Sequence, residues 1–433
     1  MASKLAAQGG LRVLVSGAGI AGPTLAWFLA CSGARVTVLE RAAELLAQGQ
    51  NIDLRGTALN VVHQMGVLDA IRACNTTEKG TEFIDDRGRP FATFALGEGG
   101  GGALTTEHEI LRCDLAHILY KAAESQPGVD FRFGTTIERV VENGESAVRV
   151  ELSSGEEVEY DVLVLADGQW SKMRKQVFGT EGLEVVDKNC YVGYYTVPRT
   201  SEDGEMSCIH IAPRSRVVLT RPDNHGTTRA SFSIVPNDAA QKEAWERASR
   251  SRDRKLQMDL LRSEFGDIGW KAPRLLREMD AADDLYFQGV QQIRLAKWYK
   301  NRVVCLGDTA YAPTPLTGMG TSLAIDGAYL LAGHLSQLQP GQHPATAFQA
   351  YDEQFRPFVS KTQAIPFFVP RILHPQAAWS RWIIQTLIAT AARVSRLSWI
   401  TKLFASNKPT TLSDGLVAEL DAPFPSFPAF RRS

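Results

Sequence analysis

The chain has no excess of charge of one sign and no clustered cysteines, and both absences narrow what it can do. Its 47 Lys and Arg residues against 48 Asp and Glu residues leave a formal net charge of −1, so no basic surplus is present to neutralise the phosphates of a nucleic acid. The six cysteines are scattered without a CxxC pair or His-rich spacing. This pattern argues against a metal site and indicates reduced, mostly buried thiols of an intracellular protein.

Long hydrophobic runs are also absent. No stretch approaches the ~18 uninterrupted apolar residues that a membrane-spanning helix needs, and residues 1–10 lack the apolar core of a secretory signal. We therefore expect a cytoplasmic protein. Hydrophobic residues still make up 44% of the 433-residue chain, enough for a large core in two or three domains.

The first motif lies near the N-terminus and has the pattern of a dinucleotide site. An apolar strand at 11–16 precedes a GxGxxG run, a helix follows, and a second strand ends at Glu40. Such glycines allow a tight turn and close approach of the backbone to a pyrophosphate, while the acidic residue can accept from a ribose hydroxyl. The alternative is that the glycines serve packing only. The residues that we assign to this site are Gly17, Gly19, Gly22, Glu40 and Arg41.

A second glycine-containing stretch follows the apolar run at 303–306. Asp308 stands at the end of that run, two prolines stiffen the next loop, and a Gly-x-Gly pair opens a helix that extends to about 335. Ligands of open α/β sheets bind at the carboxyl ends of strands, and the free N–H groups of a helix N-terminus favour an electron-rich partner. The residues assigned here are Asp308, Pro315, Gly318, Gly320 and Thr321.

Two further elements lie between these motifs. The continuous apolar strand at 162–166 ends at Asp167-Gly168, with Arg174 seven positions beyond Asp167. Asp-Gly is also an ordinary turn, but its place between an apolar strand and a helix is the geometry that a second nucleotide contact requires. Arg112 begins a helix of its own. We assign Asp167, Gly168 and Arg112 to the same ligand.

Together these four elements resemble those of the FAD-dependent monooxygenases of the para-hydroxybenzoate hydroxylase type, the single-component aromatic hydroxylases. In that family the first motif holds the ADP half of FAD, and the late Gly-Asp motif holds the ribityl chain and flavin. The resemblance covers residues 11–335 in the right order. It implies FAD as cofactor, with NADH or NADPH as a transient reductant.

The resemblance also implies a reaction. Dioxygen adds at the C4a position of the reduced flavin, and the hydroperoxide hydroxylates a small organic substrate that is aromatic, phenolic or polyketide-like. The Trp-x-Trp-x-Ile signature of the related flavin halogenases is absent, and no Ser-His-Asp arrangement suggests hydrolysis. No catalytic base is assigned. Two alternatives stay open: a flavin dehydrogenase or oxidase that its substrate reduces directly, and a non-enzymatic FAD-binding protein at a lipid surface.

We expect an α/β fold in which a GxGxxG dinucleotide-binding, Rossmann-like FAD domain carries an inserted, mainly antiparallel substrate sheet and a helical C-terminal region. Short strands with period-two character between 186 and 290 indicate the inserted sheet. The glycine-rich run at 97–102 is typical of a loop. The expected divisions are 10–80, 104–185 and 286–365 for the FAD domain, 81–103 and 186–285 for the substrate sheet, and 366–433 for the C-terminal region.

Several polar residues are candidates for the substrate side. In the resembling family the segment after 49 passes beside the flavin ring, and the inserted sheet forms the substrate platform. The alternative is that Asp53 and Arg55 pair their charges at the surface, and that the sheet residues are ordinary packing. The candidates are Gln50, Asp53, Arg55, Tyr194, Tyr195, His210 and Arg216.

The C-terminal region has an unusual charge pattern. Residues 354–413 contain no Asp or Glu but eight Lys and Arg residues, interleaved with Trp, Ile, Leu and Phe at helical spacing. Such a helix can lie on an anionic membrane. We favour the other interpretation, in which these helices cap the flavin domain and their arginines face an acidic surface. The sequence leaves the oligomeric state open.

Overall fold

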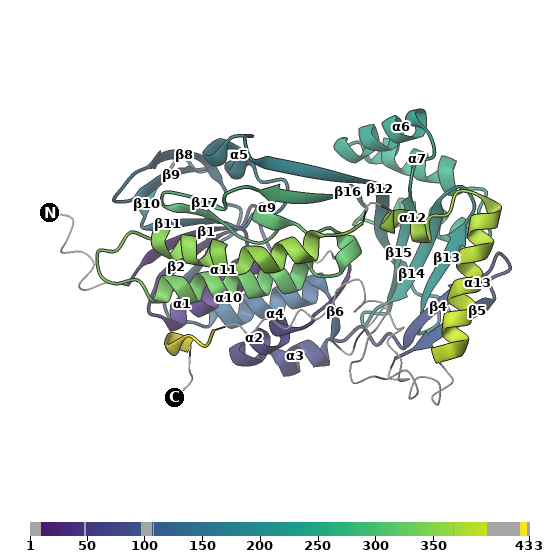
Figure 1. The fold of residues 1–433 in the computed structure, drawn as a ribbon, viewed down its shortest axis with the longest axis horizontal. Coiled ribbons are helices and arrows are strands. Elements are labelled where there is room, and N and C mark those ends of the chain that lie inside the picture. Colours follow the sequence, from purple (N-terminus) through teal and green to yellow (C-terminus); the bar gives the residue numbers. More distant parts are fainter. Residues whose placement is uncertain are drawn as a thin grey trace.

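A six-stranded sheet forms the core of one half of the molecule (Figure 1). The computed structural model describes residues 10–46, 49–96, 106, 108–366, 368–395 and 425–430. The sheet has the order β17-β18-β11-β1-β2-β7 and is parallel except for β17. Its strands are β1 (Arg12–Ser16), β2 (Arg35–Leu39), β7 (Val129–Arg132), β11 (Val162–Leu165), β17 (Tyr299–Lys300) and β18 (Val303–Cys305).

Helices cover this sheet because its central strands are apolar on both faces. Every residue of β11 is buried, as expected for a parallel strand inside an α/β unit. Helix α1 packs between α4 and α10, and α2 and α11 pack on α10. The helices of this half are α1 (Ala21–Cys31), α2 (Thr57–Met65), α3 (Leu68–Ala73), α4 (Arg112–Glu124), α5 (Lys172–Phe178), α9 (Asp308–Tyr311), α10 (Gly320–Ser336) and α11 (Ala345–Gln363).

The described C-terminal residues 425–430 return to this half, where η4 (Pro428–Phe430) lies beside α1. Phe430 packs on Phe28 at 4.8 Å between ring centroids, and Phe427 packs on Tyr329 at 5.4 Å. A small antiparallel sheet completes the half. Its strands are β8 (Ile137–Asn143), β9 (Val148–Leu152) and β10 (Glu157–Tyr160).

A seven-stranded sheet dominates the other half, in the order β16-β12-β15-β14-β13-β4-β5. It is antiparallel except for the β4–β13 pair. The 80–95 segment forms a hairpin, and β4 joins that hairpin to the larger sheet. The strands are β4 (Gly80–Ile84), β5 (Pro90–Ala95), β12 (Leu183–Pro198), β13 (Ser207–Ala212), β14 (Arg216–Pro222), β15 (Thr227–Ile234) and β16 (Tyr286–Leu295).

The two faces of this sheet are covered differently. One face packs against α6, α7 and α8 through a core that includes Phe232 and Trp245. The outer strands of the opposite face pack against α13. The helices are α6 (Ala239–Arg250), α7 (Arg254–Phe265), α8 (Ala272–Glu278), α12 (Val369–Leu373) and α13 (Ala378–Ser395), with short turns η2 (Met279–Ala281) and η3 (Pro315–Thr317).

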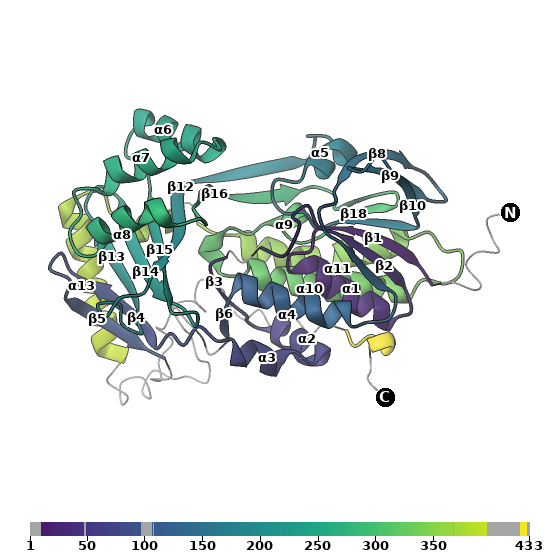
Figure 2. The same ribbon diagram turned by 180° about the vertical axis from the view of Figure 1, so that it is seen from behind.

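The long strands β12 and β16 pair with each other and run from one half to the other. Figure 2 shows the two-stranded sheet of β3 (Asn51–Asp53) and β6 (Glu109–Leu111) between the halves. Three of the six cysteines, Cys190, Cys208 and Cys305, are buried, and none of the six forms a disulfide.

One expectation about the C-terminal region is wrong. Helix α13 does not cap the half that contains the parallel sheet, where the FAD domain was expected. It packs on the seven-stranded sheet, because Ile384, Ile388 and Ala391 match the apolar outer strands of that sheet. Its Arg381 does face an acidic group, Asp86. The glycine-rich run at 97–102 and most of the C-terminal region beyond Ser395 lie outside the described residues.

Candidate functional site

Four neighbouring strands deliver the predicted motifs to one edge of the parallel sheet. Strand β1 lies between β2 and β11, and β18 lies beside β11. Their last paired residues are in register, with Ser16 opposite both Leu39 and Leu165 and Leu165 opposite Cys305. The motifs follow these carboxyl ends directly, which is where α/β sheets bind ligands. The structure therefore brings Gly17, Glu40, Asp167 and Asp308 to a common edge, which we call the motif edge.

The three glycines of the first motif differ in what a side chain would contact at each position. Gly17 has a φ of +113°, and a Cβ there would lie 2.4 Å from the oxygen of Ala166. A Cβ on Gly22 would lie 2.0 Å from the oxygen of Gly17. On Gly19, by contrast, the nearest described atom would be Nη2 of Arg112 at 3.5 Å. The fold itself requires Gly17 and Gly22, whereas Gly19 leaves open space beside a cation.

Glu40 holds the glycine loop in place. Its carboxylate accepts hydrogen bonds from the backbone N–H of Ala18 at 3.1 Å and of Ala42 at 3.0 Å. Each carboxylate oxygen has more than one acceptor site, so these bonds leave capacity for a ribose hydroxyl. Arg41, the next residue, is exposed.

A buried arginine joins two of the motifs. Arg174 is 2% exposed, and its guanidinium donates to the backbone oxygens of Thr309 at 2.7 Å and Gln169 at 2.8 Å. The hydroxyl of Thr309 in turn accepts from the N–H of Gly168 at 2.9 Å. The Asp167-Gly168 turn and the Asp308 loop are thus fixed relative to each other. The sequence pointed to Arg174 only as a neighbour of the motif, and Thr309 was missed.

Asp308 and Arg112 form the charged part of this edge. Both side chains are exposed, although Asp308 lies deep in the molecule. Removal from bulk water raises the pKa of Asp308, and the nearby Arg112 cation opposes the rise. Partial burial raises the pKa of the nearby Tyr286 hydroxyl of β16, and the charges of Arg112 and Asp308 also act on it: Arg112 lowers this pKa and Asp308 raises it. Tyr286 is 48% exposed and was missed as a site residue because it stands within an ordinary strand pattern.

The start of α10 completes the edge. A Cβ on Gly320 would lie 3.9 Å from Oδ1 of Asp308, so the carboxylate stands beside the helix N-terminus. Gly318 has a φ of +63°, and a Cβ there would meet no described atom within 4 Å. Pro315 and Gly318 are exposed, and Thr321 is half-buried. The open glycines, the exposed cation and the exposed carboxylate fit the phosphates and hydroxyls of FAD.

The residues expected beside the flavin lie where β3 contacts α10. The backbone oxygen of Gln50 accepts from the N–H of Arg112 at 3.0 Å, and the N–H of Arg55 donates to Ser322 Oγ at 3.2 Å. Arg55 and Asp53 form an ion pair at 2.9 Å. Their side chains are only 22% and 10% exposed, so the charges pair, but inside the molecule rather than at its surface.

The sheet residues divide by face. Tyr194 pairs with Tyr286 across β12 and β16 and so belongs to the face that meets the motif edge. Tyr195 points the other way and stacks on Phe232 beneath α7. The sequence placed these neighbours together, but strand alternation separates them.

His210 and Arg216 are not brought to the motif edge. Arg216 is buried and forms an ion pair with Asp267, next to the end of α7. His210 is 2% exposed, lies beside Trp270 and has its Nδ1 3.2 Å from the oxygen of Ile84. Both therefore serve the helix-covered side of the sheet, and neither is retained as a substrate candidate.

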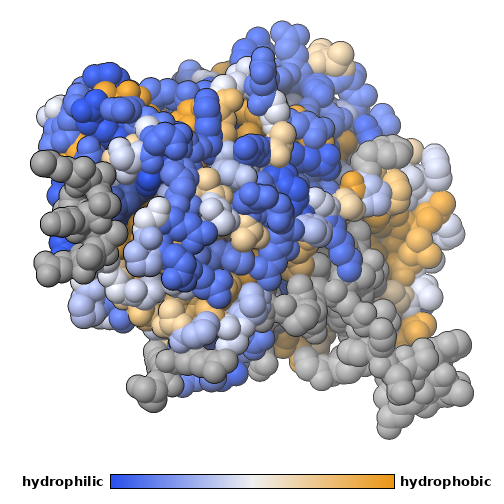
Figure 3. Space-filling view, turned by 60° about the vertical axis from the view of Figure 1, so that its left-hand side comes forward, coloured by the Kyte–Doolittle hydropathy of each residue, from blue (hydrophilic) through white to orange (hydrophobic). Residues whose placement is uncertain are grey.

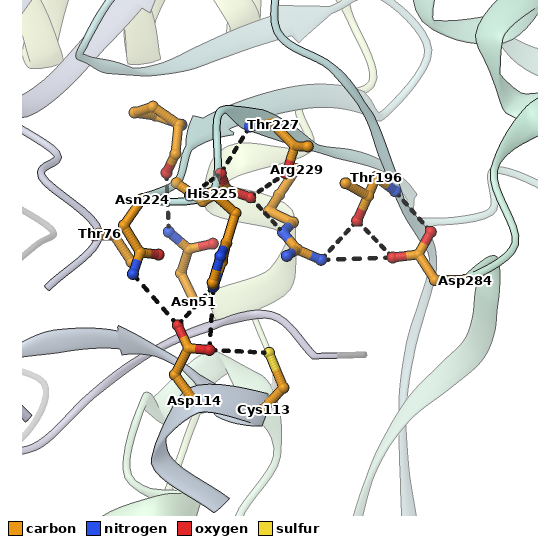
Figure 4. A network of polar contacts seen from close by, with 12 residues as sticks. Asn51, Thr76, Cys113, Asp114, Thr196, Asn224, His225, Thr227, Arg229 and Asp284 are labelled. Atoms are coloured by element: carbon orange, nitrogen blue, oxygen red, sulfur yellow. Dashed lines mark hydrogen bonds and ion pairs between the residues drawn. The ribbon is translucent and has the colours of Figure 1, made fainter. Parts of the chain in front are cut away.

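A polar network connects α4 with the hairpin between β14 and β15 (Figure 4). Asp114, two residues after Arg112, lies 3.0 Å from Nε2 of His225 and accepts from Asn224. Behind these contacts, Arg229 donates to Asp223 at 3.1 Å and to Thr196 at 2.6 Å. The network holds the seven-stranded sheet against the helix that begins at Arg112.

Two buried glutamates share one arginine nearby. Arg221 of β14 donates to Glu78 at 2.9 and 3.0 Å and also pairs with Glu109, and both carboxylates are at most 1% exposed. Burial raises the pKa of Glu78 to about 7; Arg221 opposes this rise, and the charge of Glu109 adds to it. The sequence offered no signal for this cluster, since its members lie far apart along the chain.

This cluster predicts how stability depends on pH. The usual pKa of a glutamate is 4.5, so between about pH 4.5 and 7 the folded protein holds a proton that the unfolded chain has lost. The free energy of unfolding should therefore fall as pH rises through this window, by on the order of 3 kcal/mol at most. Glu78→Gln should abolish the fall in urea titrations from pH 5 to 8. The exposed Glu205→Gln serves as control, and an unchanged slope in Glu78→Gln would contradict the assignment.

Comparison with known proteins identifies the family of the chain. The model of the family described as FAD binding domain matches residues 10–364. Monooxygenase CTB7 of Cercospora beticola is 35% identical over 386 residues, which are 87% of this chain and 90% of that protein. FAD-dependent monooxygenase asL4 of Sarocladium schorii is 31% identical over 436 residues, with 94% and 96% covered.

A solved structure shows the same architecture. The tetracycline destructase Tet(55) superposes with a TM-score of 0.73 at 28% sequence identity, over 89% of this chain and 97% of that one. The resemblance inferred from the four motifs is confirmed. The chain belongs to the FAD-binding-domain family of flavin-dependent monooxygenases, as an α/β flavoenzyme of the para-hydroxybenzoate hydroxylase-like type that uses FAD with NADH or NADPH.

Proposed function

We propose that this monooxygenase hydroxylates a phenolic, aromatic or polyketide-like molecule held between the motif edge and the seven-stranded sheet. The observation that carries the proposal is the pairing of Tyr286 with Tyr194 on one face of β16 and β12, where β16 contacts the helix α9 that begins at Asp308. Aromatic side chains that face a cofactor edge suit a planar organic substrate. By the same reasoning, residues 186–285 with the 81–96 hairpin form the substrate domain, and the parallel-sheet half is the FAD domain.

We assign the cofactor contacts as follows. Gly19 admits the pyrophosphate, Glu40 accepts from the adenosine ribose, and Asp308 accepts from hydroxyls of the ribityl chain. Arg112 and Arg41 offset the phosphate charge. The remaining contacts come from Gly17, Gly22, Asp167, Gly168, Pro315, Gly318, Gly320 and Thr321.

Bound FAD supplies the redox chemistry, and the chain supplies position and electrostatics. The free N–H groups at the start of α10 would stabilise negative charge on a bound flavin. The ion pair of Asp53 with Arg55 and the bond from Arg55 to Ser322 keep the β3 segment against that helix. Gln50, adjoining Arg112, is retained as a substrate-side candidate.

The relatives' names support the substrate class. One similar structure is named for the destruction of tetracycline, a fused-ring phenolic compound. Another, at 19% identity and therefore informative about the fold alone, holds FAD and uric acid. The proposed substrate shares the electron-rich, phenolic character of tetracycline.

The test is nicotinamide oxidation across a panel of phenols, fused-ring polyketides and non-aromatic lipophiles. The expected result is faster NADH or NADPH oxidation with one of the aromatic compounds and a product heavier by one oxygen atom. Stimulation by non-aromatic compounds only would overturn the substrate class. Bleaching of the flavin by substrate alone, under anaerobic conditions and without nicotinamide, would instead favour a dehydrogenase.

Asp308→Ala is expected to weaken FAD binding. A hydrogen bond to a charged acceptor contributes about 1.5–3 kcal/mol, so the dissociation constant should rise roughly 10- to 100-fold. The apoprotein should be no less stable, because surrounding protein already disfavours the charge of this carboxylate. Fluorescence titration of the apoprotein with FAD measures the effect. Asp308→Asn, which keeps an acceptor oxygen, is the matched control, and equal affinity of Asp308→Ala and wild type would refute the role.

A further inference from the structure

Helix α13 is apolar on two sides. Its inner side carries Ile384, Ile388 and Ala391, which pack on the outer strands of the seven-stranded sheet. Arg381 anchors this side by donating to the backbone oxygen of Ile211 at 2.8 Å and by pairing with Asp86. The inner contacts alone account for the position of the helix.

The outer side is also apolar, yet it faces solvent. Trp379 is 70% exposed, Trp382 67% and Leu387 63%, and Ile383 is exposed as well. Their spacing of 3, 4 and 8 residues from Trp379 places them on one side of the helix. Figure 3 shows hydrophobic surface where α13 lies at the margin of the molecule. We call these four residues the outer face of α13.

Two threonines make this face more apolar than its sequence suggests. Thr386 donates its hydroxyl to the oxygen of Trp382 at 2.8 Å, and Thr390 donates to the oxygen of Thr386 at 2.7 Å. Both residues are exposed and lie on the same side as Trp379 by helical spacing. Their hydroxyl hydrogens are therefore bonded within the helix and are not available to solvent.

Exposed large hydrophobic residues are concentrated on and next to α13. Of the thirteen exposed large hydrophobic residues in the described parts of the chain, seven lie between Phe368 and Val394. Scattered single hydrophobic residues on a surface need no explanation, but a contiguous group marks an interaction site.

The segment that carries this face has charge of one sign. Residues 368–394 contain no Asp or Glu, and Arg371 and Arg393 are exposed near the two ends of the group. The acidic partner Asp86 pairs with Arg381 on the inner side of the helix. Tryptophans on an apolar face with flanking arginines match the boundary between the headgroups and acyl chains of an anionic bilayer. Among the described residues no helix is long and apolar enough to cross a membrane, so the match is to a helix that lies on the surface.

We propose that the outer face of α13 docks this enzyme on an anionic lipid surface. A second copy of the chain is the other apolar occupant to consider. A symmetric dimer would place two acid-free, arginine-bearing faces against each other, and like charges in contact oppose association. An anionic bilayer supplies both the apolar layer and the opposite charge.

The test is co-sedimentation of the FAD-loaded protein with vesicles of phosphatidylcholine that contain about 30% phosphatidylserine. Binding is expected to these vesicles, and to be much weaker with pure phosphatidylcholine or in about 0.5 M NaCl. Trp379→Ser combined with Trp382→Ser should lower the partition coefficient by about tenfold or more. Leu387→Ser should lower it less, and Val185→Ser, which replaces a 48% exposed apolar residue on β12, should leave it unchanged.

Flavin content and thermal unfolding establish that the variants are folded, which is expected because the replaced side chains are exposed. Absence of vesicle binding by the wild type would overturn the proposal, as would undiminished binding by the double tryptophan variant. A dimer that the tryptophan substitutions dissociate, without vesicle binding, would show that a second copy occupies the face.

Discussion

Gly19→Val is expected to yield a folded protein that has lost most of its affinity for FAD. A Cβ at Gly19 would have ordinary contact with the described chain, the nearest atom being Nη2 of Arg112 at 3.5 Å. The added side chain would occupy the space through which a pyrophosphate approaches the backbone. Loss of that approach should raise the FAD dissociation constant at least about 100-fold, equivalent to about 2.7 kcal/mol.

Two other glycines separate this effect from a general loss of stability. Gly22→Val should fail to fold normally, because its Cβ would lie 2.0 Å from the oxygen of Gly17. Gly204→Val should behave as wild type, since a Cβ there meets no described atom within 4 Å. Flavin content, FAD titration and thermal unfolding of each apoprotein decide the matter. A Gly19→Val protein that keeps FAD with unchanged affinity would disprove the cofactor assignment.

Arg174→Leu is expected to lower the stability of the protein strongly. The substitution leaves the buried backbone oxygen of Thr309 and the partly buried one of Gln169 without their donor. Each unsatisfied buried group costs about 1–3 kcal/mol, so the free energy of unfolding should fall by about 3 kcal/mol or more. FAD affinity should fall too, because the Asp308 loop and the Asp167 turn are no longer fixed relative to each other.

Urea unfolding of the apoprotein measures the first effect and FAD titration measures the second. Arg174→Lys should recover only part of both, since an ammonium group cannot reproduce the two-armed geometry of a guanidinium. Lys175→Leu, at the adjacent exposed position, is the control for loss of a cation from α5. Equal stability of Arg174→Leu and Lys175→Leu would show that the hydrogen bonds of Arg174 do not stabilise the two loops.

Local patterns determined the cofactor half. A strand, a glycine turn and a helix are adjacent along the chain, so the motifs at Gly17 and Asp308 can each be recognised from one short segment. Parallel strands place their carboxyl ends at one edge, which made the meeting of these motifs predictable. The structure reproduces it through the neighbouring strands β2, β1, β11 and β18.

The sheet residues were harder to place because period-two alternation does not say which face meets which partner. Tyr194 and Tyr195 carry the same side chain, yet only the first lies on the face toward Tyr286. The helices α6 to α8 cover one face of the sheet. His210 and Arg216 lie on that face and therefore away from the motif edge. The contact of Arg221 with Glu78 and Glu109 joins segments that are distant in sequence, so no local pattern predicts it.

The sequence by itself determined that this protein binds FAD and that its C-terminal helices are basic and apolar, because both properties reside in short contiguous segments. Only the tertiary structure decided which aromatic side chains share the edge with Asp308, how Arg174 fixes the two loops, and where α13 packs. The physical reason is the same in each case. Burial of one apolar face selects the partner of each element, and that selection leaves the outer face of α13 exposed.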